Sequence, residues 1–223
     1  MDHLPRPRIR PEKGARDRLI RLAATHPEWA LGFEDETWWS RFAQPSMHSW
    51  AAVGEPARLV RQPLVKDDPD PKALAAYGML LRSVEPDGGT DERVLLRFVD
   101  GRPVSSITTR FLHWSLGKLE EMGKKALLLI WDNASWHISR EVTEWIGAHN
   151  RRVRESRSGV RIVSCQLPVR SPWLNPVEPM WVHGKRKVVE FDGPLGAYEL
   201  ADRACEVFGC DHEPHLSIPQ EVA

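Results

Sequence analysis

The sequence predicts an α/β protein built on one mixed sheet, with antiparallel strands first, parallel strands after them, and helices on its faces. Two observations support this fold class. Before Ser105, apolar residues alternate with period two or form short runs separated by turn-rich segments such as 85–89. From Ser105 onward, helical spacing alternates with short, continuously apolar runs, which is the pattern of strands buried on both faces of a sheet.

The first half of the chain is expected to hold one short helix followed by strands. Apolar residues at helical spacing predict the helix over 14–28, ending near Pro27. The strands are apolar or alternating segments bounded by glycine or proline. They are expected over 30–39, 48–53, 58–65, 73–83 and 94–99, with the last two paired as a hairpin through the turn at 85–89.

The second half is expected to alternate helix and strand. Ser105 or Ser106 is predicted to cap a helix that stops at Gly123, and Ser139 is predicted to cap a second helix bearing Val142. The remaining elements follow the same alternation and lead into a tail. They are strands over 126–131 and 160–167 and helices over 176–190 and 196–208.

Composition describes an ordinary globular protein and excludes several classes. The chain has 223 residues, enough to bury a core in one large domain. No apolar run approaches the roughly 20 residues that span a bilayer, and none follows the basic N-terminus as a secretory signal would. Three cysteines cannot all pair, which suits a reducing cytosol. We therefore expect a cytoplasmic protein with no membrane partner.

The formal net charge is zero, but basic residues are grouped at 6–21, 151–161 and 185–187. Local basic patches on a neutral protein permit contacts with phosphates, although each cluster can equally be a solvated face. The candidates for DNA binding are Arg151, Arg152, Arg154, Lys185, Arg186 and Lys187.

Acidic residues stand where solubility alone does not require them. Asp35 shares its strand face with Leu31 and Phe33, where a charge is costly unless it is paired or bound to a metal. The alternatives for Asp35 are an ion pair at a strand end and a shift of register that exposes its side chain. Asp132 follows a buried strand, and sites form beyond the carboxyl ends of parallel strands. The alternative for Asp132 is a turn formed with Asn133.

Glu178 stands at the start of a predicted helix, in the sequence Asn175-Pro176-Val177-Glu178. The structural alternative is a capping box, in which Asn175 caps the helix and Glu178 reaches back to the cap. That alternative does not explain the rigid, proline-containing loop 168–174 that delivers the helix to a fixed place. Three carboxylates on separate elements are what two divalent metals need to clamp a phosphodiester.

Together these stretches resemble the catalytic domain of bacterial insertion-sequence transposases of the mariner-like DDE superfamily. The family pattern is Asp-Glu on the first strand, Asp-Asn-Ala with a nearby His after the fourth, and Ser-Pro-x-Leu-Asn-Pro-[Ile/Val]-Glu-x-x-Trp opening the last core helix. The chain carries Asp35-Glu36, Asp132-Asn133-Ala134 with His137, and the full last element over 171–181. The resemblance spans about 31–192, and the last element is its most specific part.

The resemblance implies a ribonuclease-H-like fold and makes Asp35, Asp132 and Glu178 the ligands of two Mg²⁺ or Mn²⁺ ions. One metal would lower the pKa of a water that attacks the transposon end, and the freed 3′-hydroxyl would then attack target DNA. The implied partners are double-stranded DNA, as terminal inverted repeats and as target, and a second copy of the chain in a homodimer on DNA. The candidates for orienting the metal ligands or contacting phosphate are Glu36, Asn133, His137 and Asn175.

The expected organisation is a basic arm and helix over 1–30, the catalytic domain over 31–192, and a C-terminal helix and tail over 193–223. The family carries helix-turn-helix modules before the catalytic domain, so an upstream helix-turn-helix polypeptide is a further expected partner, in a bacterial, nucleoid-associated setting. The interval from Asp132 to Glu178 is longer than usual in the family. The alternative functions are a ribonuclease-H-like nuclease without strand transfer and an inactive DNA-binding remnant.

The C-terminal segment contains a second pattern of potential metal ligands. Cys205, Cys210, His212 and His215 form the pattern Cys-x₄-Cys-x-His-x₂-His. The residue types suit Zn²⁺, but the spacings differ from those of common structural zinc sites. The sequence therefore favours a docked tail with incidental cysteines over a zinc site.

Overall fold

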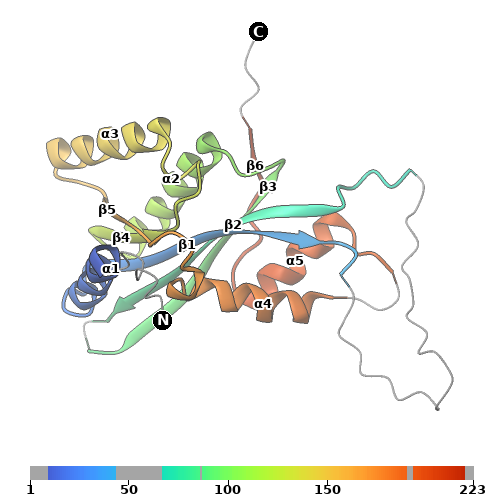
Figure 1. Cartoon of the computed structure of the whole chain (residues 1–223), viewed down its shortest axis with the longest axis horizontal. Coiled ribbons are helices and arrows are strands. Elements are labelled where there is room, and N and C mark those ends of the chain that lie inside the picture. Colours follow the sequence, from blue (N-terminus) through green and yellow to red (C-terminus); the bar gives the residue numbers. More distant parts are fainter. Residues whose placement is uncertain (1–9, 44–66, 86, 190–192, 219–223) are drawn as a thin grey trace, which may run out of the picture.

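The computed structural model describes residues 10–43, 67–85, 87–189 and 193–218. A six-stranded sheet, in the order β5-β4-β1-β2-β3-β6, runs through the molecule between helices (Figure 1). The elements are α1 (Arg10–Ala23), β1 (Trp29–Ser40), β2 (Ala73–Val84), β3 (Thr90–Asp100), α2 (Ser105–Glu121), β4 (Ala126–Trp131), α3 (Arg140–Ser156), β5 (Arg161–Gln166), a 3₁₀ turn (Pro172–Leu174), α4 (Val177–Val188), α5 (Ala197–Phe208) and β6 (Leu216–Ser217). Within these ranges, no helix combines the length and apolarity needed to cross a bilayer.

The antiparallel half of the sheet is formed by β1, β2 and β3. β1 pairs with β2 from Leu31 opposite Arg82 to Ser40 opposite Ala73. β2 pairs with β3 across the turn that follows it, so the predicted hairpin is confirmed.

The parallel half begins on the other side of β1. β4 runs parallel to β1, with Phe33 opposite Ile130, and β5 runs parallel to β4 at the edge of the sheet. All six residues of β4 are buried, as the apolar run 126–131 predicted. Because β1 and β4 are parallel, residues that follow β4 emerge beside the C-terminal half of β1.

Alternation along β1 divides the core in two. Leu31, Phe33 and Trp39 pack with residues of α1, α4 and α5, whereas Ala30 packs with residues of α2 and α3. The two helix layers lie on opposite sides of the sheet (Figure 1). β1 is therefore covered on both faces, so a polar residue in its middle is buried whichever way it points.

Element boundaries differ from the prediction at the N-terminus. The first helix runs over Arg10–Ala23 and not over 14–28. It ends before Pro27 because the side chains of Thr25 and His26 both bond to the carbonyl of Leu22, at 3.0 and 2.8 Å. The extended segments expected over 48–53 and 58–65 lie outside the described residues.

Two further local predictions are wrong. The N-cap of α2 is Val104, whose backbone carbonyl accepts from the N–H groups of Ile107 and Thr108, so neither serine caps the helix. The tail after α5 also contains a short strand, β6, paired parallel with the end of β3. By contrast, Ser139 caps α3 as predicted, accepting from the N–H of Val142 at 3.2 Å.

Candidate active site

Asp35 lies on β1, and Asp132 directly follows the neighbouring parallel strand β4, at the same height along the strands. The last paired residues of β1 and β4 are Phe33 and Ile130, and each aspartate follows its strand partner by two positions. Side chains two positions apart point to the same face of a strand. Asp35 therefore points to the face of Phe33, as period two predicted, toward the layer that contains α4.

The carboxylate of Asp35 is held by α4. Trp181 Nε1 donates a hydrogen bond to Asp35 Oδ2 at 2.9 Å. Burial, followed by the charges of Glu178, Glu34 and Glu36, raises the pKa of Asp35 to about 8. Asp35 thus lies in an excess of negative charge, which a cation would relieve.

Glu178 enters from the first turn of α4. Asn175 anchors this helix start to β1, because its Nδ2 donates to the backbone carbonyl of Glu34 at 3.0 Å. The N-cap position is Pro176 and no side chain caps it, so the capping-box alternative is not formed. Glu178 and Asp132 instead line one cleft of about 250 Å³. Burial, and then the charge of Asp132, raises the pKa of Glu178.

Asp132 is positioned through its Oδ1 atom. His137 Nδ1 lies 2.8 Å from this oxygen, and the N–H of Ala134 donates to it at 2.8 Å, forming the turn that was the structural alternative. Partial burial opposes ionisation, but the bond from His137, the bond from Ala134 and the charge of His137 lower the pKa of Asp132 overall. Of the three predicted ligands, Asp132 is therefore the most readily ionised.

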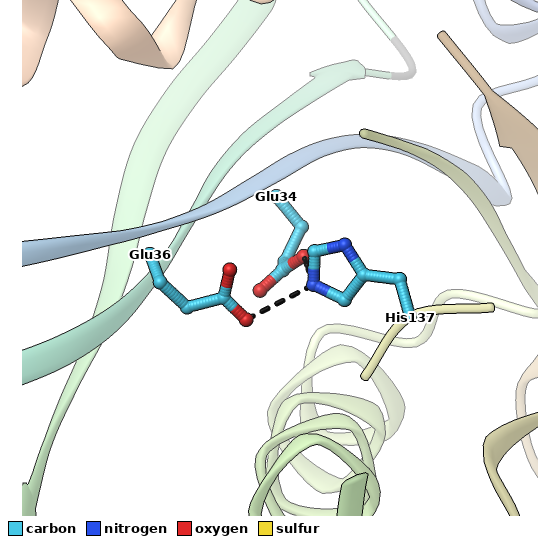
Figure 2. Close-up of side chains that lie close together, drawn as sticks. All are labelled: Glu34, Glu36 and His137. Carbon is cyan, nitrogen blue, oxygen red and sulfur yellow. Dashed lines mark hydrogen bonds and ion pairs between the residues drawn. The ribbon is translucent and has the colours of Figure 1, made fainter. Parts of the chain in front are cut away.

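A second acidic group lies on the opposite face of β1, around His137 (Figure 2). His137 Nε2 is 2.9 Å from Glu36 Oε1 and 3.1 Å from Glu34 Oε2. Trp136 Nε1 also donates to Glu36 Oε1, at 2.8 Å. Glu34, Glu36 and His137 each offer one possible metal-ligand atom, and these three atoms lie within 4.8 Å of one another. Among the described histidines, cysteines, aspartates and glutamates, no other group of three meets this distance.

Glu34 is the most constrained member of this group. It is 0% exposed, and neither carboxylate oxygen has a hydrogen-bond partner, since the single Nε2–H of His137 serves Glu36. Burial, and then the charge of Glu36, raises the pKa of Glu34 to about 7. Burial opposes protonation of His137, but the charge of Glu34 and the bond to Asp132 raise its pKa overall. His137 is thus a buried cation that joins this group to Asp132.

Glu34 was not among the residues predicted from sequence. The period-two pattern assigned one buried face to β1, the face of Asp35, and left Glu34 on the other. The parallel strand and two helix layers bury both faces. The signal was present in the sequence, because the apolar run 126–131 already predicted a sheet covered on both sides.

Asn133 and the loop after β5 shape the cleft. Asn133 Nδ2 donates to the carbonyl of Leu167 at 2.5 Å and so ties the end of β4 to the end of β5. The loop 168–172 lines the same cleft, together with Asn175 and Glu178. The proline-containing loop that precedes α4 therefore borders the predicted site.

The predicted DNA-binding residues differ in their setting. Those on α3 and at the end of α4 are exposed, whereas Lys185 is half-buried and its Nζ donates to Thr37 Oγ1 at 2.5 Å. Burial lowers the pKa of Lys185, against the charges of Asp35 and Glu178. Lys185 thus interacts with the acidic site itself. The exposed members are Arg151, Arg152, Arg154, Arg186 and Lys187.

Comparison of the sequence with known families finds one match in this region. Residues 98–192 match the family model described as DDE superfamily endonuclease. This segment of the chain is therefore similar to a DDE superfamily endonuclease. The matched segment includes β4 and α4, and with them Asp132 and Glu178, while Asp35 lies before it on β1. No curated protein matches the chain.

Solved structures similar to this chain include several of the Mos1 mariner transposase. The Mos1 strand transfer complex aligns with a TM-score of 0.55 at 16% identity, over 95% of this chain and 56% of that one. The Mos1 paired-end complex with the left transposon end gives 0.53 at 15% identity, over 95% and 58%. The Mos1 mariner paired-end complex with Mn gives 0.53 at 18% identity, over 94% and 57%.

At these identities the likeness to Mos1 concerns the fold, and the chain spans less than two thirds of the length of those proteins. The mixed sheet flanked by helices matches the ribonuclease-H-like fold of the Mos1 transposase. The fold class predicted from the sequence is thereby confirmed, and the family match over residues 98–192 agrees with the predicted resemblance to the DDE superfamily.

Proposed function

We propose that this chain is the catalytic domain of a transposase that cleaves DNA strands with the help of divalent metal ions at Asp35, Asp132 and Glu178. The observation that carries the proposal is the electrostatic coupling of these three acids. They come from β1, the end of β4 and α4, yet the charge of Glu178 raises the pKa of Asp35 and that of Asp132 raises the pKa of Glu178.

The residues of this site fit a hard divalent cation. Asp35 and Glu178 are partly buried carboxylates with raised pKa values, and half-buried Lys185 is the cation beside them. The bonds to Asp132 both fall on Oδ1, so that Oδ2 accepts no hydrogen bond from the described residues and can serve as a ligand. An all-oxygen donor set of this kind suits Mg²⁺ or Mn²⁺. We propose two ions.

A bound metal would supply a Lewis acid and lower the pKa of a water nucleophile. The protein's side chains have separate tasks. Asp132, already ionised, is the first ligand available, and Asp35, whose pKa is about 8, releases its proton as the cation binds, so metal affinity should rise with pH. Trp181 and His137 fix the directions of Asp35 and Asp132 by hydrogen bonds.

The proposed substrates are double-stranded DNA segments, first the terminal inverted repeats and then a target whose phosphodiester the freed 3′-hydroxyl attacks. The Mos1 structures with the same fold are a paired-end complex with the left transposon end and a strand transfer complex, which supports this proposal by analogy. Exposed arginines on α3 supply phosphate contacts that carry no sequence information. We further propose a homodimer on DNA and a helix-turn-helix polypeptide as partners, in a bacterial nucleoid.

The proposed division of the chain remains an N-terminal arm over 1–30, a catalytic domain over 31–192 and a C-terminal segment over 193–223. α1 packs on the same core as β1, with its Leu19 and Ile20 against that face of the sheet. The helix of the arm therefore contributes to the stability of the catalytic fold.

The test is cleavage of supercoiled plasmid and of labelled linear duplex by the purified chain. Mg²⁺ or Mn²⁺ should support strand cleavage, Ca²⁺ should bind without turnover, and EDTA should abolish the activity. Asp132→Asn should lower cleavage by at least about a hundredfold, the scale of removing one essential electrostatic group. Its melting temperature should be equal or slightly lower, because the charge that is removed is the one that His137 and the N–H of Ala134 stabilise.

The matched control is Asp91→Asn. Asp91 pairs with Arg93 at 2.6 Å. It lies on β3, two strands away from β1, and five residues from Leu96, the β3 residue at the level of Asp35. It should cleave like the parent chain. Cleavage that survives EDTA, or that falls equally in both variants, would refute the proposal. Labelled 3′ ends that are cut but never joined to a second duplex would limit the function to that of a nuclease.

A further inference from the structure

The C-terminal segment brings two histidines together in a way that the proposed function does not use. His212 follows α5, and His215 immediately precedes β6, which pairs with the end of β3. The facing ring nitrogens, His212 Nε2 and His215 Nε2, lie 3.2 Å apart. The segment that the sequence analysis described as a docked tail is therefore held against the sheet with its imidazoles paired.

Each imidazole is oriented by a carboxylate on its other nitrogen. His212 Nδ1 lies 2.7 Å from Asp202 Oδ1 on α5, and His215 Nδ1 lies 2.8 Å from Asp100 Oδ1 at the end of β3. An ionised carboxylate can only accept, so both Nδ1 atoms carry the hydrogen. In the neutral imidazoles both Nε2 atoms then present lone pairs, and these lone pairs face each other.

Two nitrogen lone pairs that face each other at this separation repel, unless a proton or a metal ion lies between them. A tetrahedral zinc ion roughly 2.0–2.1 Å from each of two nitrogens holds them about 3.3–3.4 Å apart. The observed 3.2 Å is close to that span. The carboxylate on each Nδ1–H is moreover the arrangement that fixes the tautomer and raises the basicity of a histidine metal ligand.

The surroundings leave the pair reachable. The side chains of His212 and His215 are 10% and 18% exposed, and their aspartate partners are about half exposed or more. Phe98 lies beneath both rings, with centroid distances of 6.0 and 5.7 Å. Asp202 and Asp100 attract cations to the two partly exposed imidazoles. Contact with the ring of Phe98 restricts the movement of both imidazoles.

The cysteines of the same sequence pattern are turned to other partners. Cys205 is buried, and Cys210 Sγ donates to its backbone carbonyl at 3.6 Å. Across the described residues, a set of three donor atoms within 4.8 Å occurs only around His137 and includes neither cysteine. The ligand set here is thus two imidazoles, with the remaining positions left to water or to an added ligand.

We propose that His212 and His215 form a binding site for a borderline divalent cation, Zn²⁺ before others, separate from the acidic site on β1. Imidazole nitrogen suits zinc and disfavours magnesium, so the two sites differ in the metal that they take. The ligands come from the segment that joins α5 to β6, and their orienting carboxylates come from α5 and β3. Bound zinc would therefore fasten the C-terminal segment to the sheet. This inference does not depend on the proposed transposase activity.

The test is calorimetric titration of the EDTA-stripped, dialysed full chain with Zn²⁺ in excess Mg²⁺, which occupies oxygen sites but not an imidazole pair. The parent chain should bind one zinc ion that the double variant His212→Asn/His215→Asn does not. Asp100→Asn and Asp202→Asn should each weaken binding by about 10- to 100-fold. His113→Asn, an exposed histidine on α2, is the matched control and should bind like the parent.

Nitrogen-15 spectra of the imidazoles in the parent chain test the same claim without any substitution. Zinc should shift the Nε2 signals of His212 and His215 and leave their Nδ1 signals as protonated nitrogens. The proposal is overturned if the Nε2 signals do not respond to zinc and instead report a shared proton. It is also overturned if the double variant keeps the parent's zinc stoichiometry, or if Cys205→Ser or Cys210→Ser removes binding as fully as loss of the histidines.

Discussion

The raised pKa of Asp35 makes a quantitative prediction about stability. The unfolded chain releases this proton near pH 4, whereas the folded chain keeps it until about pH 8. Between these values the folded state binds more protons than the unfolded state, so the free energy of unfolding must fall as the pH rises. One proton gives a slope of about 1.4 kcal/mol per pH unit.

From about pH 4 to about pH 7 the loss amounts to roughly 4 kcal/mol for this one group, as an upper limit, since the side chain is only partly withdrawn from water. Asp35→Asn removes the titrating proton and keeps a side-chain oxygen to accept from Trp181 Nε1. The variant should therefore be less stable than or equal to the parent near pH 4, more stable near pH 8, and less dependent on pH throughout.

The assay is urea denaturation in EDTA at several values between about pH 4 and about pH 8, for the parent and for Asp35→Asn, with midpoints converted to unfolding free energies. Glu34, with a pKa of about 7, contributes a further loss of the same sign in both proteins, so the difference between the two curves isolates Asp35. Parallel curves would refute the assignment of Asp35 to a buried, electronegative site. Adding Mg²⁺ near pH 8 should stabilise the parent more than the variant.

Two further predictions test the support of the site and its partner surface. Gly78→Ala should destabilise the fold by about 1–3 kcal/mol and shift the fluorescence of Trp181, because the new Cβ would lie 2.1 Å from Trp181 Cη2. Gly117→Ala, a helical glycine with no atom within 4 Å of the added Cβ, is the control and should be neutral or stabilising. Reversing the charges of Arg151 and Arg152 should weaken binding to all duplexes alike and lower the salt slope by about two, measured by fluorescence anisotropy. A loss confined to one DNA sequence would contradict a phosphate-only role.

The parts of the fold that were predictable are those determined by local patterns. The run Ala126–Trp131 matched β4 residue for residue, because six consecutive apolar residues can be buried only in a strand or helix covered on all sides. Ser139 identified the start of α3 because its hydroxyl satisfies a free N–H of the first turn. The face of Asp35 followed from period two alone.

What the sequence could not predict depends on contacts between distant segments. The apolar run 126–131 indicates that β1 is covered on both faces, but the approach of His137 to Glu34 depends on the fold. Asn175 Oδ1 accepts from the N–H of Val177 at the helix start, at 3.4 Å, and its Nδ2 also donates to β1, a partner 141 residues away. The pairing of β6 with β3 involves two residues, too few to leave a periodic pattern.

Three consecutive acids, Glu34, Asp35 and Glu36, occupy the middle of β1, and this has a consequence for how the strand must be aligned. If β1 slipped by one residue, a glutamate would replace Asp35 opposite Trp181 of α4, so the charge pattern alone cannot select the correct alignment. Gly32 can. A Cβ at its position would lie 2.8 Å from both Leu127 and Met79, and a slip would bring Leu31 or Phe33 there. A residue with no side chain thus favours the alignment in which Asp35, and neither glutamate, faces α4.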